Sequence, residues 1–339
     1  ETMASVVETL TDHDIMPICF DRRLGQVIAQ TIIHTFMEDV YLSLFSFEGS
    51  EVYYLDNTTF EECLDYHTDC VPLARKGEGI FVLSETDKTI HHKSNETTPY
   101  QTLKTKLYKE ATNLNVYVVS RNNKLDFMLQ SFYEYEKIYG TEFNATWIND
   151  EQLVDMIDDL NNSKEEAKIL LLSEEINDKE GLDANVIDNL IYIEGHLKRK
   201  DIDIIVEILD PNNQEIIRDF NINNTIISNK IVSLLLSKIA LFSNTESFYE
   251  NLLTLEINDE EEDDQEVFIR SAGEILDEPF PITFNSKKEL VKSFYHSFDQ
   301  KLVPFGYVRD KVFNAFSDNL HKEISCELLE TDLLVLMKL

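Results

Sequence analysis

The sequence predicts an α/β protein organised around a doubly wound parallel sheet, with smaller α+β lobes attached to it. The first observation is a dense run of β-branched residues over positions 202–209, which is typical of a strand buried on both faces. Strands buried on both faces belong mostly to parallel sheets that are covered by helices. The second observation is the order of the next elements. Residues 212–220, 225–228 and 230–242 predict helix, strand and helix, as in the second half of a doubly wound sheet.

The local signals at the end of this strand support that order. Asp210 is suited to cap a helix, and Pro211 fits the first turn of a helix, where its missing N–H is no loss. Residues 230–242 are apolar on nearly every side. A helix of this kind is covered either by its own protein or by a partner.

Three strand-and-helix pairs are predicted ahead of this run, and they make the βαβαβ order nearly complete. They consist of a strand at 114–119 with a helix at 125–139, a strand at 143–148 with a helix at 150–161, and a strand at 168–173 with a helix at 184–198.

A domain-scale repeat is also predicted. Val40-Tyr41 aligns with Phe248-Tyr249 at an offset of 208 residues (249 − 41 = 208), and residues 51–53 align with 266–268 after the gap left by an acidic loop. The first copy lacks the early strands of the sheet. The predicted domains are 1–48, the end of a truncated first sheet domain with its crossover helices; 49–113, a first small lobe and linker; 114–256, a second sheet domain with crossover helices; and 257–339, a second small lobe.

The remaining elements follow from local patterns. We expect strands at 15–20, 70–74, 79–83, 267–269, 282–284 and 333–336, and helices at 60–66, 100–113 and 287–298, with an acidic loop at 258–265.

Composition excludes some functions. A formal net charge of −34 argues against nucleic-acid binding and against docking on anionic lipid headgroups. No apolar run approaches the roughly 18 residues that cross a bilayer. The first ten residues resemble the middle of an amphipathic helix, so we expect a soluble part of a longer protein. The four cysteines occur in no C-x-x-C pair, which predicts free thiols.

The residues around the long strand resemble a known family. Glu207-Ile-Leu-Asp210-Pro211-Asn-Asn213, followed by the strand at 226–228 and the helix at 231–240, is similar to the "E-x-x-D-P-x-N" segment of the RCK domains (regulators of potassium conductance) of CASTOR/POLLUX-type ion channels. Glu330-Thr-Asp-Leu-Leu334 resembles the closing "E-x-D-x-L" strand of the same family. The resemblance implies tandem RCK modules with a Rossmann-like sheet, the first of them truncated. It also implies regulatory ligands, cations or nucleotides, bound near strand ends or between modules.

The candidate ligand site is the turn after the first strand of the second sheet, formed by Ser120, Arg121, Asn122 and Asn123. A dinucleotide site needs glycines here so that the pyrophosphate can approach the backbone, and the turn has none. NAD binding is therefore not expected, and the cofactor stays unknown. The turn is suited either to an anion or other small ligand, or to an ordinary polar connection. Glu207 matches the acidic strand-end position of the family and is a further candidate, with hydrogen bonding to loop amides as its alternative role.

No catalytic or metal constellation is predicted. The sequence has no Gly-x-Ser-x-Gly elbow, and its histidines are scattered. Residues 259–266 carry seven carboxylates, but they lack the alternating ligands and the glycine of an EF-hand. Cys63, His67 and Cys70 share one segment without an evident fourth ligand, so free thiols are favoured over a metal site.

These observations lead to a functional expectation. The chain is expected to be a non-enzymatic cytoplasmic gating-ring region of a ligand-regulated cation or potassium channel, on the cytoplasmic face of a membrane, with a pore domain upstream. Self-association into dimers or a ring is expected through the crossover helices at 26–36 and 230–242. The alternatives are a free-standing cytoplasmic subunit of a TrkA-like potassium uptake system, or a degenerate Rossmann NAD-dependent oxidoreductase.

Overall fold

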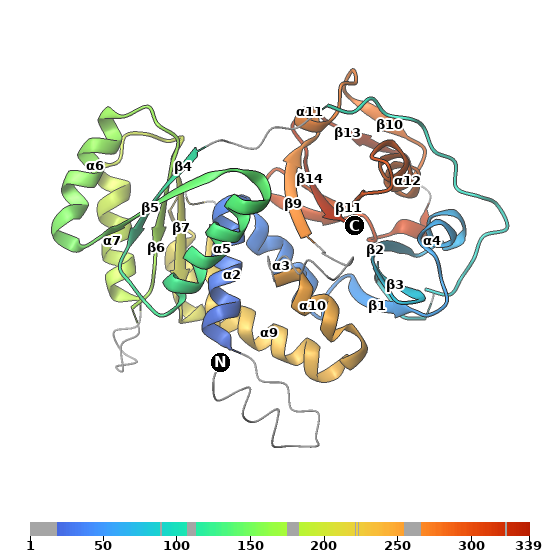
Figure 1. Cartoon of the computed structure of the whole chain (residues 1–339), viewed down its shortest axis with the longest axis horizontal. Helices are drawn as coiled ribbons and strands as arrows, with labels where there is room; N and C mark the ends of the chain where they lie inside the picture. Colours follow the sequence, from blue (N-terminus) through green and yellow to red (C-terminus); the bar gives the residue numbers. More distant parts are fainter. Residues whose placement is uncertain are drawn as a thin grey trace.

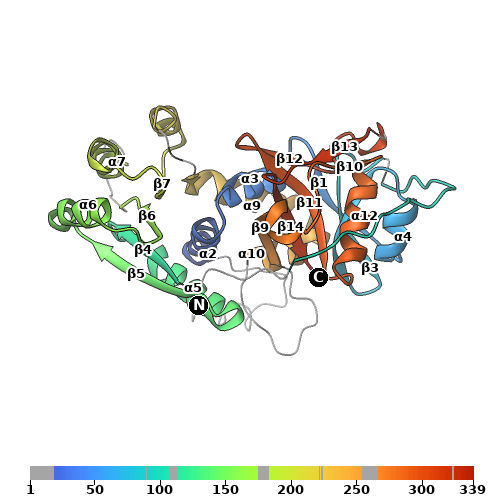
Figure 2. The same cartoon turned by 90° about the horizontal axis from the view of Figure 1, so that it is seen from above.

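The computed structural model describes residues 19–88, 90–106, 113–174, 183–220, 222, 224–253, 266–322 and 324–339. A parallel sheet with its helices forms one part of the molecule, and antiparallel lobes form the other (Figure 1). Four helices, α2, α3, α9 and α10, lie between these two parts in both views (Figures 1 and 2). None of the described helices is long and apolar enough to cross a membrane.

The parallel sheet confirms the predicted α/β fold class. Its five strands run in the order β5-β4-β6-β7-β8, and every neighbouring pair is parallel. Their bounds are β4 Asn113–Val119, β5 Glu142–Ile148, β6 Ala167–Leu171, β7 Asp203–Ile208 and β8 Asn224–Ile227.

Helices cover both faces of this sheet, as its apolar strands require. Along β7, Ile205 belongs to the core that includes α5 and α9, whereas Ile204 and Val206 belong to the core under α6 and α7. This alternation is the period of two that a strand imposes on its side chains. The helices are α5 Lys124–Tyr139, α6 Leu153–Asn162, α7 Ala184–His196 and α9 Ser228–Leu241, with short turns η1 Asp150–Gln152, η3 Pro211–Asn213 and α8 Gln214–Ile217.

The two small lobes have the same strand order. In the first lobe, β1 Glu51–Leu55, β2 Cys70–Lys76 and β3 Gly79–Ser84 pair as β1-β3-β2, and in the second the corresponding order is β9-β14-β11. One helix, α4 Phe60–Tyr66 or α12 Lys287–Ser297, precedes the second strand of each lobe in sequence. The second lobe adds β12 Val312–Ala315 at the edge of its sheet and a separate pair of short strands, β10 and β13. The bounds of its other elements are β9 Glu266–Ser271, α11 Ala272–Ile275, β10 Ile282–Phe284, β11 Leu302–Arg309, η5 Leu320–Lys322, β13 Cys326–Leu328 and β14 Leu333–Lys338.

The lobes also share a local irregularity. The register of β2 against β3 shifts between Pro72 and Ala74, and the register of β11 against β14 shifts between Pro304 and Gly306. A proline has no N–H for the ladder, so a bulge beside it is the usual accommodation. The shared Val-Pro-x-small pattern is a repeat signal that our sequence analysis missed.

The helix pairs α2–α3 and α9–α10 contact each other reciprocally. The bounds are α2 Phe20–Ile33, α3 Met37–Phe45 and α10 Glu246–Leu253, with a short turn η4 Ser243–Thr245. Tyr41 Oη donates to the Leu252 carbonyl at 3.4 Å, and Tyr249 Oη donates to the Leu44 carbonyl at 3.4 Å. Both partners are related by the offset of 208 residues found in the sequence. The two copies therefore meet as the halves of a two-fold dimer do, within one chain.

Helix α2 is covered inside the chain. Residues 24–32 of α2 are buried, and α5 of the sheet domain packs along them. The sequence predicted that the surface at 26–36 mediates self-association. That surface already packs against elements of the same chain. On the other crossover helix, Leu236 and Leu241 remain exposed.

Two local expectations need correction, and one hairpin was not expected at all. Residues 100–106 form no helix, because Gln101 N and Leu103 N donate to the Ser293 and Ser297 hydroxyls of α12 instead of to their own segment. Residue 20 begins helix α2 and does not end a strand. Residues 15–18 of that predicted strand lie outside the described residues. So do residues 107–112 of the predicted helix and the acidic loop up to residue 265. The β11–β12 hairpin was not predicted, because Pro304 and Gly306 interrupt its pattern.

Candidate functional site

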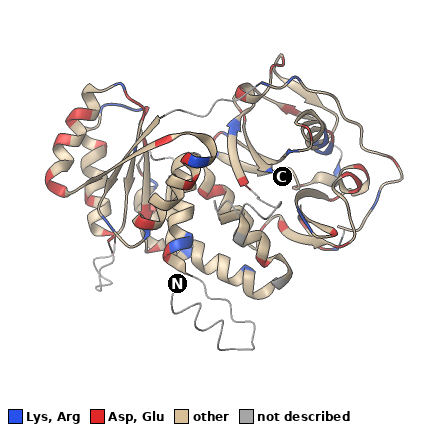
Figure 3. Ribbon diagram, viewed as in Figure 1, with Lys and Arg blue, Asp and Glu red and all other residues tan. Residues whose placement is uncertain are grey.

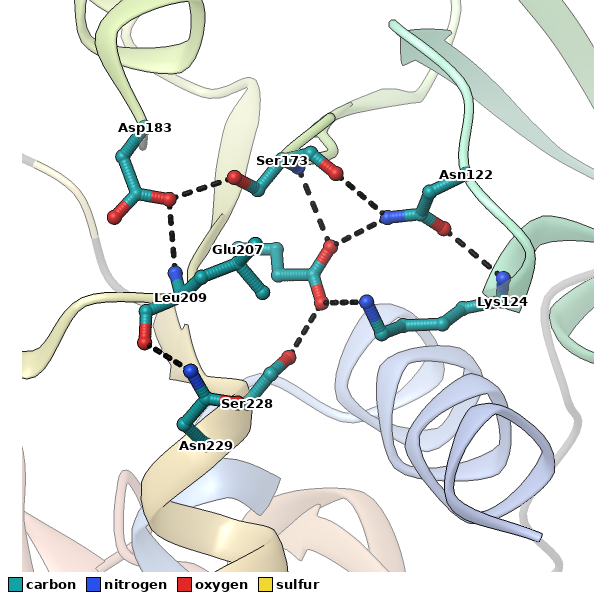
Figure 4. A network of polar contacts seen from close by, with 8 residues as sticks. All are labelled: Asn122, Lys124, Ser173, Asp183, Glu207, Leu209, Ser228 and Asn229. Atoms are coloured by element: carbon teal, nitrogen blue, oxygen red, sulfur yellow. Dashed lines mark hydrogen bonds and ion pairs between the residues drawn. The ribbon is translucent and has the colours of Figure 1, made fainter. Parts of the chain in front are cut away.

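The topological switch point of the parallel sheet lies at the carboxyl ends of its strands, between β4 and β6. The chain leaves β4 toward β5 on one side and later returns to β6 on the other, so the loops that follow β4 and β6 diverge. Ligands of doubly wound folds bind at such a switch point. Here Asn122 connects the two loops, because its Nδ2 donates to the Ser173 carbonyl and to Glu207 Oε2, both at 2.9 Å (Figure 4).

Glu207, near the end of β7, is the centre of this network and is fully buried. Ser228 Oγ and Lys124 Nζ contact Oε1, the latter at 3.1 Å. Asn122 Nδ2 and Ser173 N donate to Oε2 at 2.9 and 3.3 Å. The four donors come from different elements, so the carboxylate joins them at one point (Figure 4). A carboxylate buried away from water needs hydrogen-bond donors and an opposite charge of this kind.

Lys124 supplies the opposite charge. Its side chain is 4% exposed, and it begins helix α5. The Asn122 side chain fixes the approach of this helix, because its Oδ1 accepts a hydrogen bond from Lys124 N at 3.0 Å. The ion pair therefore joins the start of α5 to β7. Lys124 directly follows the predicted turn, and the sequence analysis gave it no role.

A second buried carboxylate, Asp183, extends the network beyond β7. Asp183 Oδ1 accepts from Ser173 Oγ at 2.6 Å and from Leu209 N at 2.8 Å (Figure 4). Its Oδ2 accepts from Asp210 N and Asn213 Nδ2, each at 2.9 Å. These contacts hold the loop after β7 against the start of α7. Asp183 was not predicted, and no local motif around it marks the position.

The other predicted residues lie apart from the network. Ser120 is 8% exposed and has φ of 68°, a left-handed conformation that glycine normally supplies in this turn. Arg121 is exposed and pairs with Asp126 at 3.4 Å. Asn123 is exposed and precedes α5 without capping it through its side chain. Asn122 and Glu207 are thus the two predicted site residues that the network brings together, through a direct hydrogen bond.

At the opposite edge of the sheet, the α2–α3 corner is fastened to the amino ends of the strands. Thr35 Oγ1 donates to Asp203 Oδ2 at 2.7 Å, and Phe36 N donates to Asn224 Oδ1 at 2.9 Å. Lys168 Nζ donates to the Ile32 carbonyl at 2.6 Å, which satisfies an end of α2. The sheet domain is thereby coupled to the paired helices.

Glu38 of α3 lies at this junction, 6% exposed. Burial, together with the neighbouring charge of Asp39, raises the pKa of Glu38 to about 8, although Lys230 and hydrogen bonds from the Thr225 and Ile227 backbone oppose the rise. Glu38 is therefore mainly protonated in the folded protein near neutral pH. The junction holds a carboxyl group whose ionisation disfavours the packed state.

We expect Glu38→Gln to remove part of the pH dependence of stability. Between the ordinary value near 4.5 and about 8, the unfolded chain has lost this proton and the folded chain keeps it, so stability falls as pH rises, by up to roughly 1.4 kcal/mol per pH unit. Urea unfolding at pH 5 and pH 8 measures this. The free energy of unfolding of the variant should exceed that of the native chain at pH 8 and should be closer to it at pH 5. Glu48→Gln, at an exposed position, is the control. An equal difference at both pH values would show that Glu38 titrates normally.

The cysteine and histidine segment forms a small buried cluster. Cys63 Sγ and Cys70 Sγ lie 3.7 Å apart, and His67 Nδ1 contacts the Ile90 carbonyl at 2.6 Å. The hydrogen bond from Cys63 lowers the pKa of the Cys70 thiol to about 6, whereas burial raises the pKa of Cys63. All four cysteines are free thiols. The described part of the chain contains no group of three or more His, Cys, Asp or Glu side chains placed to hold a metal ion.

Comparison with known proteins gives a distant match of fold. No family model and no curated protein matches the sequence. The chain is similar over 99% of its length to the GsuK channel, at 10% identity and a TM-score of 0.37, and to the GsuK RCK domain, at 9% identity and a TM-score of 0.38. It is also similar to the GsuK channel bound to NAD, at 8% identity and a TM-score of 0.34. This chain spans 58% of the length of both channel structures and 70% of that of the RCK domain. The similarity is structural and distant.

Proposed function

We propose that this chain is the cytoplasmic regulatory region of a CASTOR/POLLUX-type cation channel. The observation that carries the proposal is the reciprocal contact of the two repeats, in which Tyr41 bonds to Leu252 and Tyr249 bonds to Leu44. Each half contributes two helices and an antiparallel lobe, and one half also carries the parallel sheet. A paired arrangement of this kind suits a protein whose task is to change the relative position of its parts.

The motif residues behind the family resemblance support the proposal, because each has a definite structural task. Asp210 accepts from Asn212 N at 2.9 Å and caps the turn that Pro211 opens. Asp332 is 1% exposed, accepts from Arg309 Nε at 2.6 Å and from Leu329 N at 2.7 Å, and thus fixes the start of β14.

The mechanism that follows is a population shift. A ligand bound to the sheet domain or at its borders favours one arrangement of that domain over another, provided that it binds the two arrangements with different affinity. The contacts at Thr35, Phe36 and Lys168 would pass this displacement to the paired helices. In the full protein, the paired helices would pull on the pore.

The polar network at the switch point of the sheet argues against dinucleotide chemistry there. Asn122 and Lys124 point to Glu207 across the place where a pyrophosphate would lie in a Rossmann-like fold. NAD(H) and NADP(H) are therefore expected to leave the melting temperature of the chain unchanged in a thermal-shift assay. Stabilisation by several degrees would instead favour the oxidoreductase alternative, because a ligand that binds only the native state must raise its stability.

The proposal is tested with the full protein in liposomes. A fused channel should be encoded with two or more membrane spans upstream of this region and should conduct potassium. Removal of the region should change the potassium flux several-fold. A full protein without spans that binds a separate membrane protein would favour the free-standing TrkA-like subunit. A potassium flux that is the same with and without this region would contradict a regulatory role.

A further inference from the structure

Two buried thiols of the first lobe lie in contact. Cys63, on α4, and Cys70, at the start of β2, place their Sγ atoms 3.7 Å apart. Neither is open to solvent, since the two residues are 0% and 1% exposed. The other two cysteines of the chain are Cys19, which is exposed, and Cys326, which is half-buried. The sulfur atoms of a disulfide lie about 2 Å apart, so a closing movement of less than about 2 Å separates the buried pair from a bond.

His67, between the two cysteines in sequence, supplies a nitrogen that can take up a proton. The residue is 1% exposed, and its Nδ1 lies 2.6 Å from the Ile90 carbonyl oxygen. A carbonyl oxygen only accepts hydrogen bonds, so in the neutral ring Nδ1 carries the proton and Nε2 carries the lone pair. This Nε2 is buried and has no hydrogen-bond partner among the described residues. A buried acceptor without a donor is uncommon, and it calls for an explanation.

The surroundings make the two thiols chemically different. The hydrogen bond from Cys63 lowers the pKa of Cys70 to about 6, although burial opposes the change. His67 and Lys288 add to the lowering. Burial raises the pKa of Cys63. Cys70 is therefore the nucleophile of the pair at neutral pH, and Cys63 remains a thiol that can react with the product formed on its neighbour.

The pair lies next to a contact between the two lobes. Lys288 belongs to the first turn of α12 in the second lobe, and α12 and α4 lie side by side in both views (Figures 1 and 2). Figure 3 shows basic residues on α12 and acidic residues on α4, and Lys292 forms an ion pair with Asp65. The rings of Phe60 and Tyr295 stack with their centroids 5.3 Å apart. The helix that carries Cys63 is thus fastened to the second lobe.

We propose that Cys63 and Cys70 form a reversible redox pair, which a small hydroperoxide such as hydrogen peroxide oxidises to a disulfide. The observation that carries the proposal is the contact of two buried thiols near an imidazole nitrogen that lacks a donor. The oxidant must be small, because neither sulfur atom is open to solvent.

The reaction consists of two displacements. In the first, the Cys70 thiolate attacks one oxygen of the peroxide, so that an S–O bond forms and the O–O bond breaks. The hydroxide that leaves becomes water with the proton that His67 took from Cys70. In the second, Cys63 attacks the sulfur of the Cys70 sulfenic acid, so that the S–S bond forms and the S–O bond breaks. The departing hydroxide takes the proton of Cys63 and becomes a second water.

Atoms and electrons balance in this scheme. The two thiols lose two electrons and two protons, and one hydrogen peroxide becomes two water molecules. A dithiol reductant such as dithiothreitol restores both thiols by exchange.

The position of the pair gives oxidation a consequence. The disulfide ties α4 to β2, and a movement of α4 that closes the pair is passed to α12 through the stacked Phe60 and Tyr295 rings. Oxidation would therefore favour one placement of the two lobes. This consequence rests on the regulatory role proposed above, whereas the reaction itself does not.

The test uses the chain with Cys19→Ser and Cys326→Ser, in which the buried pair holds all the remaining thiols. Hydrogen peroxide is added, catalase ends the reaction, and the unfolded chain is alkylated with iodoacetamide and weighed by intact mass spectrometry. We expect the two thiols to disappear together, so that chains with two alkylated cysteines give way to chains with none. Dithiothreitol added before alkylation should restore both.

Variants of the cluster separate the two displacements. In the same background, Cys63→Ser should stop the reaction at the Cys70 sulfenic acid, which dimedone traps. Cys70→Ser should slow the oxidation of Cys63 by roughly tenfold or more, because the more acidic thiol is gone. Lys288→Met should slow disulfide formation several-fold, because it removes a positive charge that favours the Cys70 thiolate. Lys200→Met makes the same change where the side chain is 69% exposed beside α7, and it should leave the rate unchanged.

Two results would overturn the proposal. One is full alkylation of both buried cysteines after a dose of peroxide that oxidises exposed Cys19 in the unsubstituted chain. The other is a product in which one thiol of the pair is lost and the other always remains. Neither measurement needs a substitution at a buried position, so both hold even where Cys63→Ser or Cys70→Ser does not fold.

The reaction is followed without a membrane or a pore. A chain whose pair is oxidised to a disulfide but which does not regulate flux would disprove the proposed function alone. A chain that regulates flux and whose buried thiols stay unreactive would disprove the redox pair alone.

Discussion

Glu207→Gln is expected to lower the free energy of unfolding by roughly 3–5 kcal/mol, the range found when one partner of a buried ion pair is removed. The substitution leaves the ammonium of Lys124, which is 4% exposed, without its counter-charge. The glutamine side chain also replaces one carboxylate oxygen by an NH2 group, which cannot accept the hydrogen bond that Asn122 Nδ2 or Ser173 N donates. The shift of the urea midpoint at constant slope measures the loss.

Two variants make this result interpretable. Asp126→Asn makes the same chemical change in the exposed pair with Arg121, where we expect about 0.5 kcal/mol or less. Adding Lys124→Met to Glu207→Gln should recover part of the stability, because no unpaired charge then remains buried. A loss for Glu207→Gln no larger than that for Asp126→Asn would mean that the network is open to water.

Gly25→Ala is expected to destabilise the chain by about 1–3 kcal/mol, the usual cost of overpacking, although alanine is the better helix former. A Cβ at Gly25 would lie 2.7 Å from Phe127 Cβ, 2.8 Å from the Lys124 carbonyl oxygen and 3.1 Å from Met128 N. Two of these three are backbone atoms, so α2 and α5 would have to separate.

Gly195 is the matched control, because it also lies within a helix but has no atom within 4 Å of its Cβ position. Gly195→Ala should stabilise the chain by roughly 0.5–1 kcal/mol. Opposite signs for the two substitutions in the same unfolding assay would establish the close α2–α5 contact. Stabilisation by both would show that α5 does not cover α2.

The parallel sheet could be predicted because its information is local. Continuous apolar strands, the Asp210-Pro211 helix start and the regular alternation with helices each act within a few residues. Residues 100–106 had to be missed, since their partners Ser293 and Ser297 lie nearly 200 residues away in sequence. The β11–β12 hairpin was missed for a local reason, because its turn uses Asp310 and Lys311 at positive φ instead of the expected glycine.

The candidate site shows the same division. Asn122 and Glu207 could be named because each follows or ends a predicted strand. Asp183 and Ser228 could not, because they become partners only when β6, β7 and β8 bring their carboxyl ends to one edge.

Native mass spectrometry of this chain tests the central claim most directly. Two repeats pair inside one chain, and in the proposed function such chains assemble through surfaces left exposed, including Leu236 and Leu241 on α9. This assembly predicts species at multiples of 39.4 kDa at micromolar concentration. A strict monomer over the whole concentration range would contradict a gating assembly.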